Sequence, residues 1–291
     1  SGAKLRELLA GNANVKKIWH FGTHQVFEDR STYTCILVLS KQGNEEFQIG
    51  FIQDWNQFLF DHDSECITYP AAYISGQPWS FLPQNIVTHL EEIAPSCVAL
   101  SSLVDIFVGL QTSADQIYII HADHEDESYI YSHDKQGREF KIEKGILRKS
   151  IYDTQLVSYE KIKANSYIIF PYKEVNGRPV LYSLVEMSTD FPYALTYLTA
   201  YRTKLDQRNM PGRTNENWFA FGRSQSIRRF LSGEHLVWPV LSTSSNYVYD
   251  NDMVVFTGGG NGPFYGIEMK TTAQESIFYI CLLYTSPSPR D

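Results

Sequence analysis

Short runs of apolar or alternating residues, bounded by glycine, proline or polar residues, recur along most of this chain. Runs of this length that are rich in Val, Ile, Tyr and Phe are typical of β-strands, whereas helices need longer periodic segments. The sequence therefore predicts a strand-rich fold with few helices. The predicted strands span residues 15–21, 32–39, 45–52, 106–110, 116–120, 128–132, 138–142, 235–242 and 252–257.

The N-terminal part combines one short helix with apolar strands. Leu5, Leu8 and Leu9 lie at helical spacing, which predicts a helix over residues 1–10. Residues 32–39 are almost continuously apolar, as expected of a strand that is buried on both faces. A helix followed by buried strands indicates the edge of an α/β sheet.

A domain boundary is expected at "ISGQPWSFLPQN", residues 74–85, which contains two prolines and a glycine. Proline lacks a backbone donor and restricts the residue before it, so such a segment interrupts regular structure. We expect a division of the chain into residues 1–75, a linker over 76–100, a second domain over 101–280 and a tail over 281–291.

Two local signals stand out in the second part of the chain. Residues 167–183 form a predicted hairpin that turns at Asn176-Gly177, a pair that favours the tight hairpin turn. A longer helix is predicted after Pro192, with a polar cap among residues 188–190. The apolar face of this helix comprises Ala194, Leu198, Tyr201 and Leu205.

Cysteine and histidine usage argues against metal and disulfide chemistry. The histidines at 121, 124 and 133 border an acidic run that reads as a solvated loop, so no metal site is expected. The chain also has no apolar run long enough for a membrane helix, and we expect it to be cytoplasmic. The four cysteines are far apart and form no CxxC pair: Cys35, Cys66, Cys97 and Cys281.

Positive charge is concentrated in one segment. The whole chain has a net charge of −8, but residues 201–230 carry +5, which leaves −13 for the remainder. An acidic protein with one basic segment can bind a polyanion locally. The basic residues of this segment are Arg202, Lys204, Arg208, Arg213, Arg223, Arg228 and Arg229.

Within this basic segment, "ENWFAFGRSQSIRRF" (216–230) interleaves aromatic side chains with arginines and a glutamine. Arginine binds phosphate or reads guanine with two hydrogen bonds, and glutamine can pair with adenine. The segment therefore fits a nucleic-acid contact. An aromatic core strand flanked by solvated arginines fits the same residues.

The glycine-rich stretch "FTGGGNGPFYG" (256–266) fails the tests for a nucleotide loop. Pro263 stands where the third glycine of a dinucleotide fingerprint is needed, and the lysine of a Walker loop is absent. Gly109 in "VDIFVGLQTS" likewise stands alone, without the helix that a cofactor-binding turn requires. The glycine-rich stretch 256–266 is then either a tight connection between strands or a loop that approaches a partner closely.

Taken together, "FVGLQTSADQIYII", "ILRKSIYDTQLVSYEKIKANSYIIFPY", "NWFAFGRSQS" and "STSSNYVYDNDMVVFTGGGNGPFYG" resemble the TaqI-like C-terminal specificity domain of adenine-specific DNA methyltransferases and fused restriction-modification enzymes. This resemblance covers about residues 100–280. Residues 15–41 resemble the last strands of the catalytic domain of the same proteins. Residues 281–291 resemble a translated sequencing adapter, although a disordered Ser/Pro-rich tail is the alternative.

The resemblance implies an α+β fold in which the remnant of an α/β methyltransferase sheet precedes a β-rich target recognition domain. It implies a parent enzyme that methylates N6 of adenine in double-stranded DNA with S-adenosylmethionine, after flipping the base out of the duplex. The cofactor-binding glycine motif and the Asn-Pro-Pro-Tyr motif do not occur in this sequence. We therefore expect no catalytic or cofactor residue here, and no methyl transfer by this chain alone.

Chemistry and location within the resemblance suggest the DNA-binding residues, because recognition needs cations for phosphates and side chains for base edges. The expected phosphate contacts are Arg202, Lys204, Arg208, Arg213 and Arg228. The expected base-edge or groove contacts are Gln111, Thr112, Arg223 and Gln225, with Trp218 beside them. The glycine loop, expected to pass near the DNA backbone, comprises Gly258, Gly259, Gly260 and Asn261.

Two other functions stay open at this point. A DNA-specificity or phage-defence subunit without catalysis would share the recognition segments, and the upstream motifs of the full gene would distinguish it. A β-rich protein that binds a sugar or a peptide could use the aromatic residues and the glycine loop instead, and would lack salt-dependent DNA binding.

Overall fold

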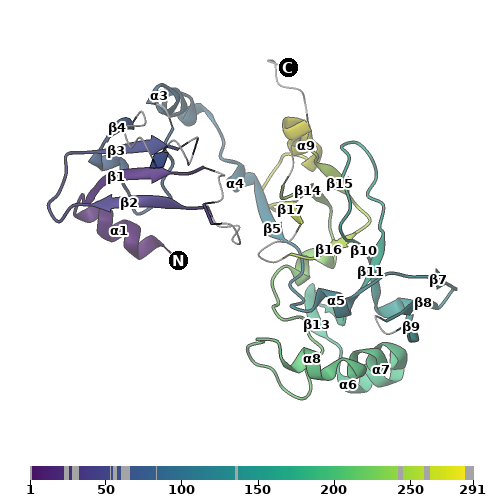
Figure 1. The fold of residues 1–291 in the computed structure, drawn as a ribbon. Helices are drawn as coiled ribbons and strands as arrows, with labels where there is room; N and C mark the ends of the chain where they lie inside the picture. Colours follow the sequence, from purple (N-terminus) through teal and green to yellow (C-terminus); the bar gives the residue numbers. More distant parts are fainter. Residues whose placement is uncertain are drawn as a thin grey trace. The chain divides into compact units, whose positions relative to one another are not determined.

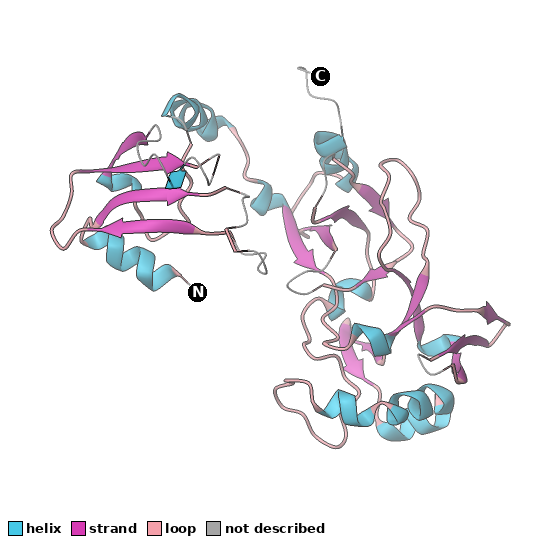
Figure 2. Cartoon of the chain, viewed as in Figure 1, coloured by secondary structure: helices cyan, strands magenta, loops and turns pink. Residues whose placement is uncertain are grey.

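The computed structural model describes residues 2–22, 26–27, 33–52, 54, 58–59, 66–82, 84–134, 137–241, 245–258 and 263–285. The chain divides into two compact units, Ser1–Cys97 and Val98–Asp291. Each unit contains its own helices and sheets (Figure 1), and the predicted α+β class is confirmed. Figure 2 shows that many strands of the second unit are short and joined by long loops.

The first unit is a four-stranded mixed sheet with the order β2-β1-β3-β4. Strands β1 and β3 run parallel, and the edge strands β2 and β4 pair with them in antiparallel fashion. Leu9 of the N-terminal helix α1 (Ala3–Gly11) packs on one face with Ile18 and Phe47. The strands are β1 (Val15–His20), β2 (Cys35–Leu39), β3 (Glu46–Phe51) and β4 (Cys66–Pro70).

The prediction of a doubly buried strand over 32–39 is wrong. Strand β2 forms, but it lies at an edge of the sheet and most of its residues are exposed, including Ile36 at 43% and Leu39 at 50%. A continuous apolar run therefore does not imply burial on both faces. Apolar composition favours a strand, but the position of that strand in the sheet depends on its neighbours.

After β4 the chain forms a 3-10 turn, η1 (Ala71–Tyr73), and then an exposed helix, α3 (Gln84–Ile93), and a second turn, η2 (Ala94–Ser96). The segment expected to be a linker, 76–100, thus contains regular structure. The helix α4 (Leu100–Leu103) follows and leads directly into the first strand of the second unit.

The second unit contains two four-stranded sheets, one of order β16-β10-β11-β6 and one of order β15-β14-β17-β5, together with a hairpin and a three-stranded sheet. Only the pairing of β10 with β16 is parallel among these ladders. The strands are β5 (Val104–Val108), β6 (Ile119–Ile120), β7 (His124–Glu125), β8 (Tyr129–His133), β9 (Glu139–Glu143), β10 (Leu147–Ile151), β11 (Ser166–Ile169), β12 (Tyr172–Val175), β13 (Arg178–Leu181), β14 (His235–Pro239), β15 (Val248–Asp250), β16 (Val255–Phe256) and β17 (Phe264–Met269).

The expected hairpin is confirmed for β12 and β13. Asn176 and Gly177 lie between the strands and both have positive φ, at 53° and 72°. A tight hairpin turn of this kind needs left-handed backbone at both central positions, which Asn and Gly tolerate best. By contrast, the run at 116–120 forms the short helix α5 (Asp115–Tyr118) before the two-residue strand β6, so the strand prediction there was largely wrong.

The predicted long helix is interrupted. Helix α6 (Leu184–Asp190) begins at a capping box between Ser183 and Glu186, a start that the sequence reading missed. It ends before Pro192, because proline disfavours helical backbone in the residue that precedes it. Helices α7 (Pro192–Ala200) and α8 (Arg202–Asp206) follow, separated at Tyr201.

The expected apolar face nevertheless packs inward, since Ala194, Leu198 and Leu205 are fully buried. Figure 1 shows α6, α7 and α8 gathered at one end of the second unit, with α9 (Ile277–Thr285) near the other. Helix α9 includes the first five residues of the expected tail, and Tyr284 stacks on Tyr247 with ring centroids 4.7 Å apart. Residues 286–291 lie outside the described ranges.

The core of the second unit is rich in aromatic residues. Phe219, Phe221, Phe230 and Phe256 are all buried, and their rings meet edge to face with neighbouring aromatics. The first three belong to the segment 216–230, so the aromatic residues of that segment are core residues. The segment is not a strand: its backbone forms turns and then the 3-10 turn η4 (Ile227–Phe230).

Candidate nucleic-acid interface

Three segments that are far apart in the sequence meet through their backbones. Gly222 N donates to the carbonyl oxygen of Thr112 at 3.0 Å, and Arg223 N donates to that of Gln111 at 3.1 Å. On the other side, Gly258 N donates to the carbonyl oxygen of Leu110 at 2.8 Å. We call residues 111–113, 222–225 and 258 the three-loop cluster.

Glycines allow the three loops to lie this close together. A Cβ atom on Gly109 would overlap the backbone of Phe256 and Thr257, and one on Gly258 would overlap the backbone of Gly109. A Cβ atom on Gly222 would overlap the side chain of Ser113. Gly109 and Gly258, the glycines that failed the nucleotide tests, therefore permit a close backbone crossing.

The surface of the three-loop cluster is polar and carries one cation, Arg223. The side chains of Ser113, Arg223 and Gln225 are exposed, and that of Gln111 is half-buried. A shallow open pocket of about 350 Å³ lies beside them. Its lining residues are Gln111, Ser113, Ala114, Asp115, Gln116 and Gly258. The backbone contacts thus bring together three of the segments that the sequence predicted to meet DNA.

Thr112 is fully buried and does not present its side chain to a groove, contrary to the expectation. Its hydroxyl accepts a hydrogen bond from Ala114 N at 3.0 Å and donates to the carboxylate of Asp115. These bonds form the turn that leads into helix α5. The hydroxyl therefore fixes the turn that carries Gln111, as serine and threonine often do in local turns.

Trp218 is also misassigned as a surface residue, since its side chain is 2% exposed. Arg202 covers its ring, with the guanidinium carbon 4.6 Å from the ring centroid. The same guanidinium donates to Asn215 Oδ1 at 3.0 Å and pairs with Asp206 at 3.4 Å. Arg202 is thus half-buried and engaged with the protein, although part of it reaches the surface.

Arg208 has a structural role in place of the expected phosphate contact. Its guanidinium donates to the carbonyl oxygens of Thr112, Trp218 and Ala220 at 2.7–3.0 Å, and its Nε donates to that of Leu205 at 3.0 Å. Four of the five N–H groups of an arginine are thereby used. Little capacity is left for an external anion.

Two buried tyrosines complete this support, and no sequence pattern pointed to them. Tyr118 Oη donates to the carbonyl oxygen of Phe219 at 2.9 Å, and Tyr172 Oη accepts from Phe221 N at 2.9 Å. Burial raises the pKa of Tyr118 above the usual range and raises the pKa of Tyr172 to about 12. Both hydroxyls therefore stay neutral and protonated near pH 7.

Other cations of the basic segment remain available. The side chains of Lys204, Arg213, Arg223 and Arg228 are exposed. Across the described ranges, no hydrogen bond or ion pair engages the last three, and Lys204 contacts the Tyr201 ring with 5.7 Å between ammonium and centroid. Exposed cations without protein partners are the groups that can neutralise phosphates at the lowest desolvation cost.

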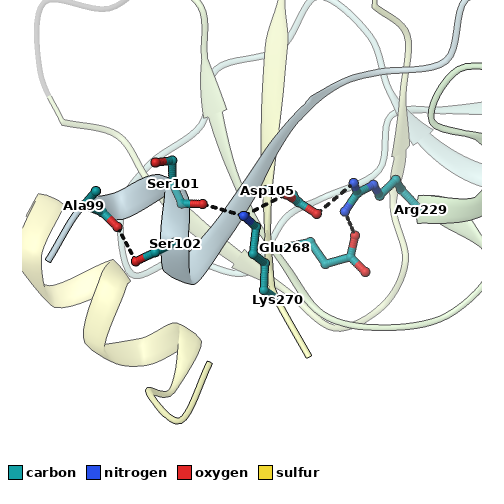
Figure 3. A network of polar contacts seen from close by, with 7 residues as sticks. All are labelled: Ala99, Ser101, Ser102, Asp105, Arg229, Glu268 and Lys270. Carbon is teal, nitrogen blue, oxygen red and sulfur yellow. Dashed lines mark hydrogen bonds and ion pairs between the residues drawn. The ribbon is translucent and has the colours of Figure 1, made fainter. Parts of the chain in front are cut away.

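Arg229, directly beside Arg228, is by contrast held within the protein. Figure 3 shows its guanidinium between Asp105 of β5 and Glu268 of β17, with Lys270 approaching Asp105 from the other side. The contact to Asp105 measures 3.2 Å. The adjacent arginines therefore differ in role, because η4 directs one side chain inward and the other outward.

The rest of the glycine loop cannot be placed. Gly259, Gly260 and Asn261 lie outside the described residues, so their expected position near DNA stays a prediction. Among the residues that are described, no helix is long and apolar enough to cross a membrane.

The described residues do not fit a site for S-adenosylmethionine. Such a site needs a glycine turn whose backbone N–H groups face an open cavity at a helix N-terminus. Here Gly109 and Gly258 face each other, and the N–H of Gly258 is already bonded to Leu110. Neither glycine is therefore available to hold that cofactor.

Comparison with known proteins gives one informative result. No family model matches the chain. The chain is 28% identical, over 300 aligned residues, to the type II restriction enzyme and methyltransferase RM.Eco57I of Escherichia coli. The match covers 98% of this chain and 30% of that relative, so the chain spans under a third of the length of the curated protein it matches. The similarity relates it to a restriction-modification protein.

Proposed function

We propose that this chain is the sequence-specific DNA recognition region of a site-specific adenine DNA methyltransferase in a restriction-modification system. The three-loop cluster carries the proposal, because it fixes the backbones of Gln111 and Arg223 to each other while leaving polar side-chain atoms on the surface. The similarity to RM.Eco57I along almost the whole chain supports it.

In this proposal the base edges are read by Gln111, Arg223 and Gln225. Arginine and glutamine are the side chains that pair bidentately with guanine and adenine in the major groove. Ser113, which shares the exposed surface, is an added candidate that the sequence reading passed over. Thr112, Trp218 and Arg208 are removed from the set of direct contacts because they are buried or engaged with carbonyl groups.

Phosphate binding falls to Lys204, Arg213 and Arg228, with a smaller contribution from Arg202, which already pairs with Asp206. These cations belong to a chain that is acidic overall, so they attract a polyanion only near the basic segment. The glycine loop from Gly258 to Asn261 lies close to the DNA backbone in this proposal.

For the parent protein we propose transfer of a methyl group from S-adenosylmethionine to N6 of adenine, in the cytoplasm. Residues 1–75 would be the last part of its catalytic domain, 76–100 a linker and 101–280 the TaqI-like specificity domain. The division of the chain near Cys97 supports this arrangement. The chain alone should transfer no methyl group, because its sequence contains no Asn-Pro-Pro-Tyr motif.

The proposal can be tested by selecting duplexes that bind residues 1–291 from a random pool and measuring affinity against salt. We expect enrichment of one short sequence and a log–log salt slope of about −0.9 per phosphate contact. Binding that does not depend on salt, or no binding at low salt, would exclude DNA recognition and favour a sugar or peptide ligand. Methylation assays on the full-length gene product would separate the enzyme from a DNA-specificity subunit without catalysis.

A further inference from the structure

Arg208 occupies an unusual position for an arginine in a basic segment. It follows α8, and its guanidinium is directed into the protein toward three carbonyl groups that belong to two separate loops. Nη1 lies 2.8 Å from the carbonyl oxygen of Thr112 and 3.0 Å from that of Ala220, and Nη2 lies 2.7 Å from that of Trp218. One side chain thus joins the loop at 111–113 to the segment that leads into 222–225.

Two tyrosine hydroxyls also hold the backbone of the segment that leads into 222–225. Tyr118 Oη binds the carbonyl oxygen of Phe219, and Tyr172 Oη accepts from Phe221 N. The guanidinium carbon of Arg208 lies 5.6 Å from the Tyr118 ring centroid, so these groups form one cluster. The backbone from Trp218 to Phe221 is therefore held at each residue before it reaches Gly222.

The position of Arg223 depends on this support. Immediately after the held residues, Gly222 N and Arg223 N bond to the carbonyl oxygens of Thr112 and Gln111. If the guanidinium were removed, three carbonyl groups in a largely buried place would lose a charged donor. The segment would then be free to shift relative to the loop at 111–113.

We propose that Arg208 is a positioning residue for DNA sequence recognition: it holds the backbones of Gln111 and Arg223 in register without touching DNA. This inference rests on the proposed function. A lysine cannot replace it, because one ammonium cannot reach acceptors that are spread around a planar guanidinium. Site geometry must be held within about 0.5 Å for such contacts to be productive.

The first test compares Arg208→Lys with Arg228→Ala in binding to a selected duplex and to a scrambled duplex over a range of salt. For Arg208→Lys we expect the ratio of the two affinities to fall by about tenfold or more, with the salt slope unchanged. Arg228→Ala should reduce the slope by about 0.9 and leave the ratio nearly constant. A reduced slope for Arg208→Ala that Arg208→Lys restores would make Arg208 a phosphate contact and overturn the proposal.

The second test needs no DNA. Hydrogen exchange of the amides of Phe221, Gly222 and Arg223 should be faster in Arg208→Lys and unchanged in Arg228→Lys. Unchanged protection in Arg208→Lys would overturn the positioning role. If the wild-type chain shows no sequence preference, the proposed function fails, while the exchange result still decides whether Arg208 holds the loops.

Arg208→Lys could be too unstable to purify. Tyr118→Phe then serves as the second variant, because it removes the hydroxyl that binds the carbonyl oxygens of Phe219 and Ala220 and leaves every exposed cation in place. It should lower the ratio of selected to scrambled affinity with no change in salt slope. An unaltered ratio together with faster exchange at Arg223 would contradict the link between loop register and recognition.

Discussion

Nη1 of Arg208 lies 2.8 Å from the carbonyl oxygen of Thr112, a residue 96 positions earlier in the chain. The bond links the basic segment at 201–230 to the first loop of the second unit. Because the same guanidinium also binds Trp218 and Ala220, the basic segment is organised around an internal arginine. Its outward arginines are therefore presented from a fixed backbone.

Arg223→Ala should relax base preference at one position of the DNA target. The expected cost is about 1–3 kcal/mol on the preferred sequence and little on others, since a bidentate contact to one base would be lost. Competition binding with duplexes that are changed one base pair at a time measures this. Gln225→Ala, a neighbour of similar exposure, is the matched variant; an equal loss on every duplex would make Arg223 a phosphate contact.

Arg228→Ala should affect DNA binding and Arg229→Ala should affect stability, although the two residues are adjacent. The first should weaken DNA binding and change the free energy of unfolding by less than about 0.5 kcal/mol, because its side chain is exposed. The second should destabilise the fold by about 1–2 kcal/mol, since at this partly exposed site Glu268 would lose its cation and Asp105 would keep only Lys270. Urea unfolding of both variants checks this, and equal stabilities would contradict it.

Gly258→Ala should destabilise the second unit by about 1–3 kcal/mol, because the new methyl group would overlap the backbone of Gly109, which cannot rotate away. Gly145→Ala is the control: the nearest atom to its new methyl group would be Cε1 of Phe191 at 3.1 Å, on a side chain that can move. Thermal unfolding of the two variants should separate them by several degrees. Equal midpoints would show that the crossing of the two loops is loose.

Asp250 should make stability depend on pH. Burial raises its pKa to about 6, whereas an unfolded aspartate titrates near 3.9. The folded state then binds more protons between these values, so this contribution is complete below about pH 4 and is lost as the pH rises through about 6. The stability of the wild type relative to Asp250→Asn should fall by on the order of 2 kcal/mol between pH 4 and 7. Denaturant titrations at both ends measure the difference, and parallel pH profiles would contradict the assignment.

The elements that the sequence predicted well are those with a local cause. The hairpin at Asn176-Gly177 follows from two residues that tolerate positive φ, and the start of α7 follows from Pro192. The edge position of β2 could not be predicted, because exposure depends on which strands pair beside it. The break at Tyr201 gave no sequence signal that we recognise.

The candidate site was predicted only in part, because residue chemistry can be seen in the sequence whereas contacts between distant segments cannot. Arginine and glutamine chemistry pointed to Gln111, Arg223 and Gln225, whose side chains do reach the surface. It could not separate Arg228 from Arg229 or identify Arg208 as internal, since the partners that distinguish them include Thr112, 96 residues from Arg208, and Asp105, 124 residues from Arg229. Trp218 was misplaced because an aromatic residue between arginines suits a core as well as an interface.

If the chain recognises DNA as proposed, the close crossing of Gly109 and Gly258 limits how new DNA specificities arise in proteins built like this one. A loop that is packed backbone to backbone against two others cannot be exchanged by itself, because any change in its path would displace its neighbours. Recombination, or an engineer who grafts specificities, would have to transfer residues 111–113, 222–225 and the glycine loop together as a three-part cassette. Point substitutions at outward side chains would be the easier route to a changed target.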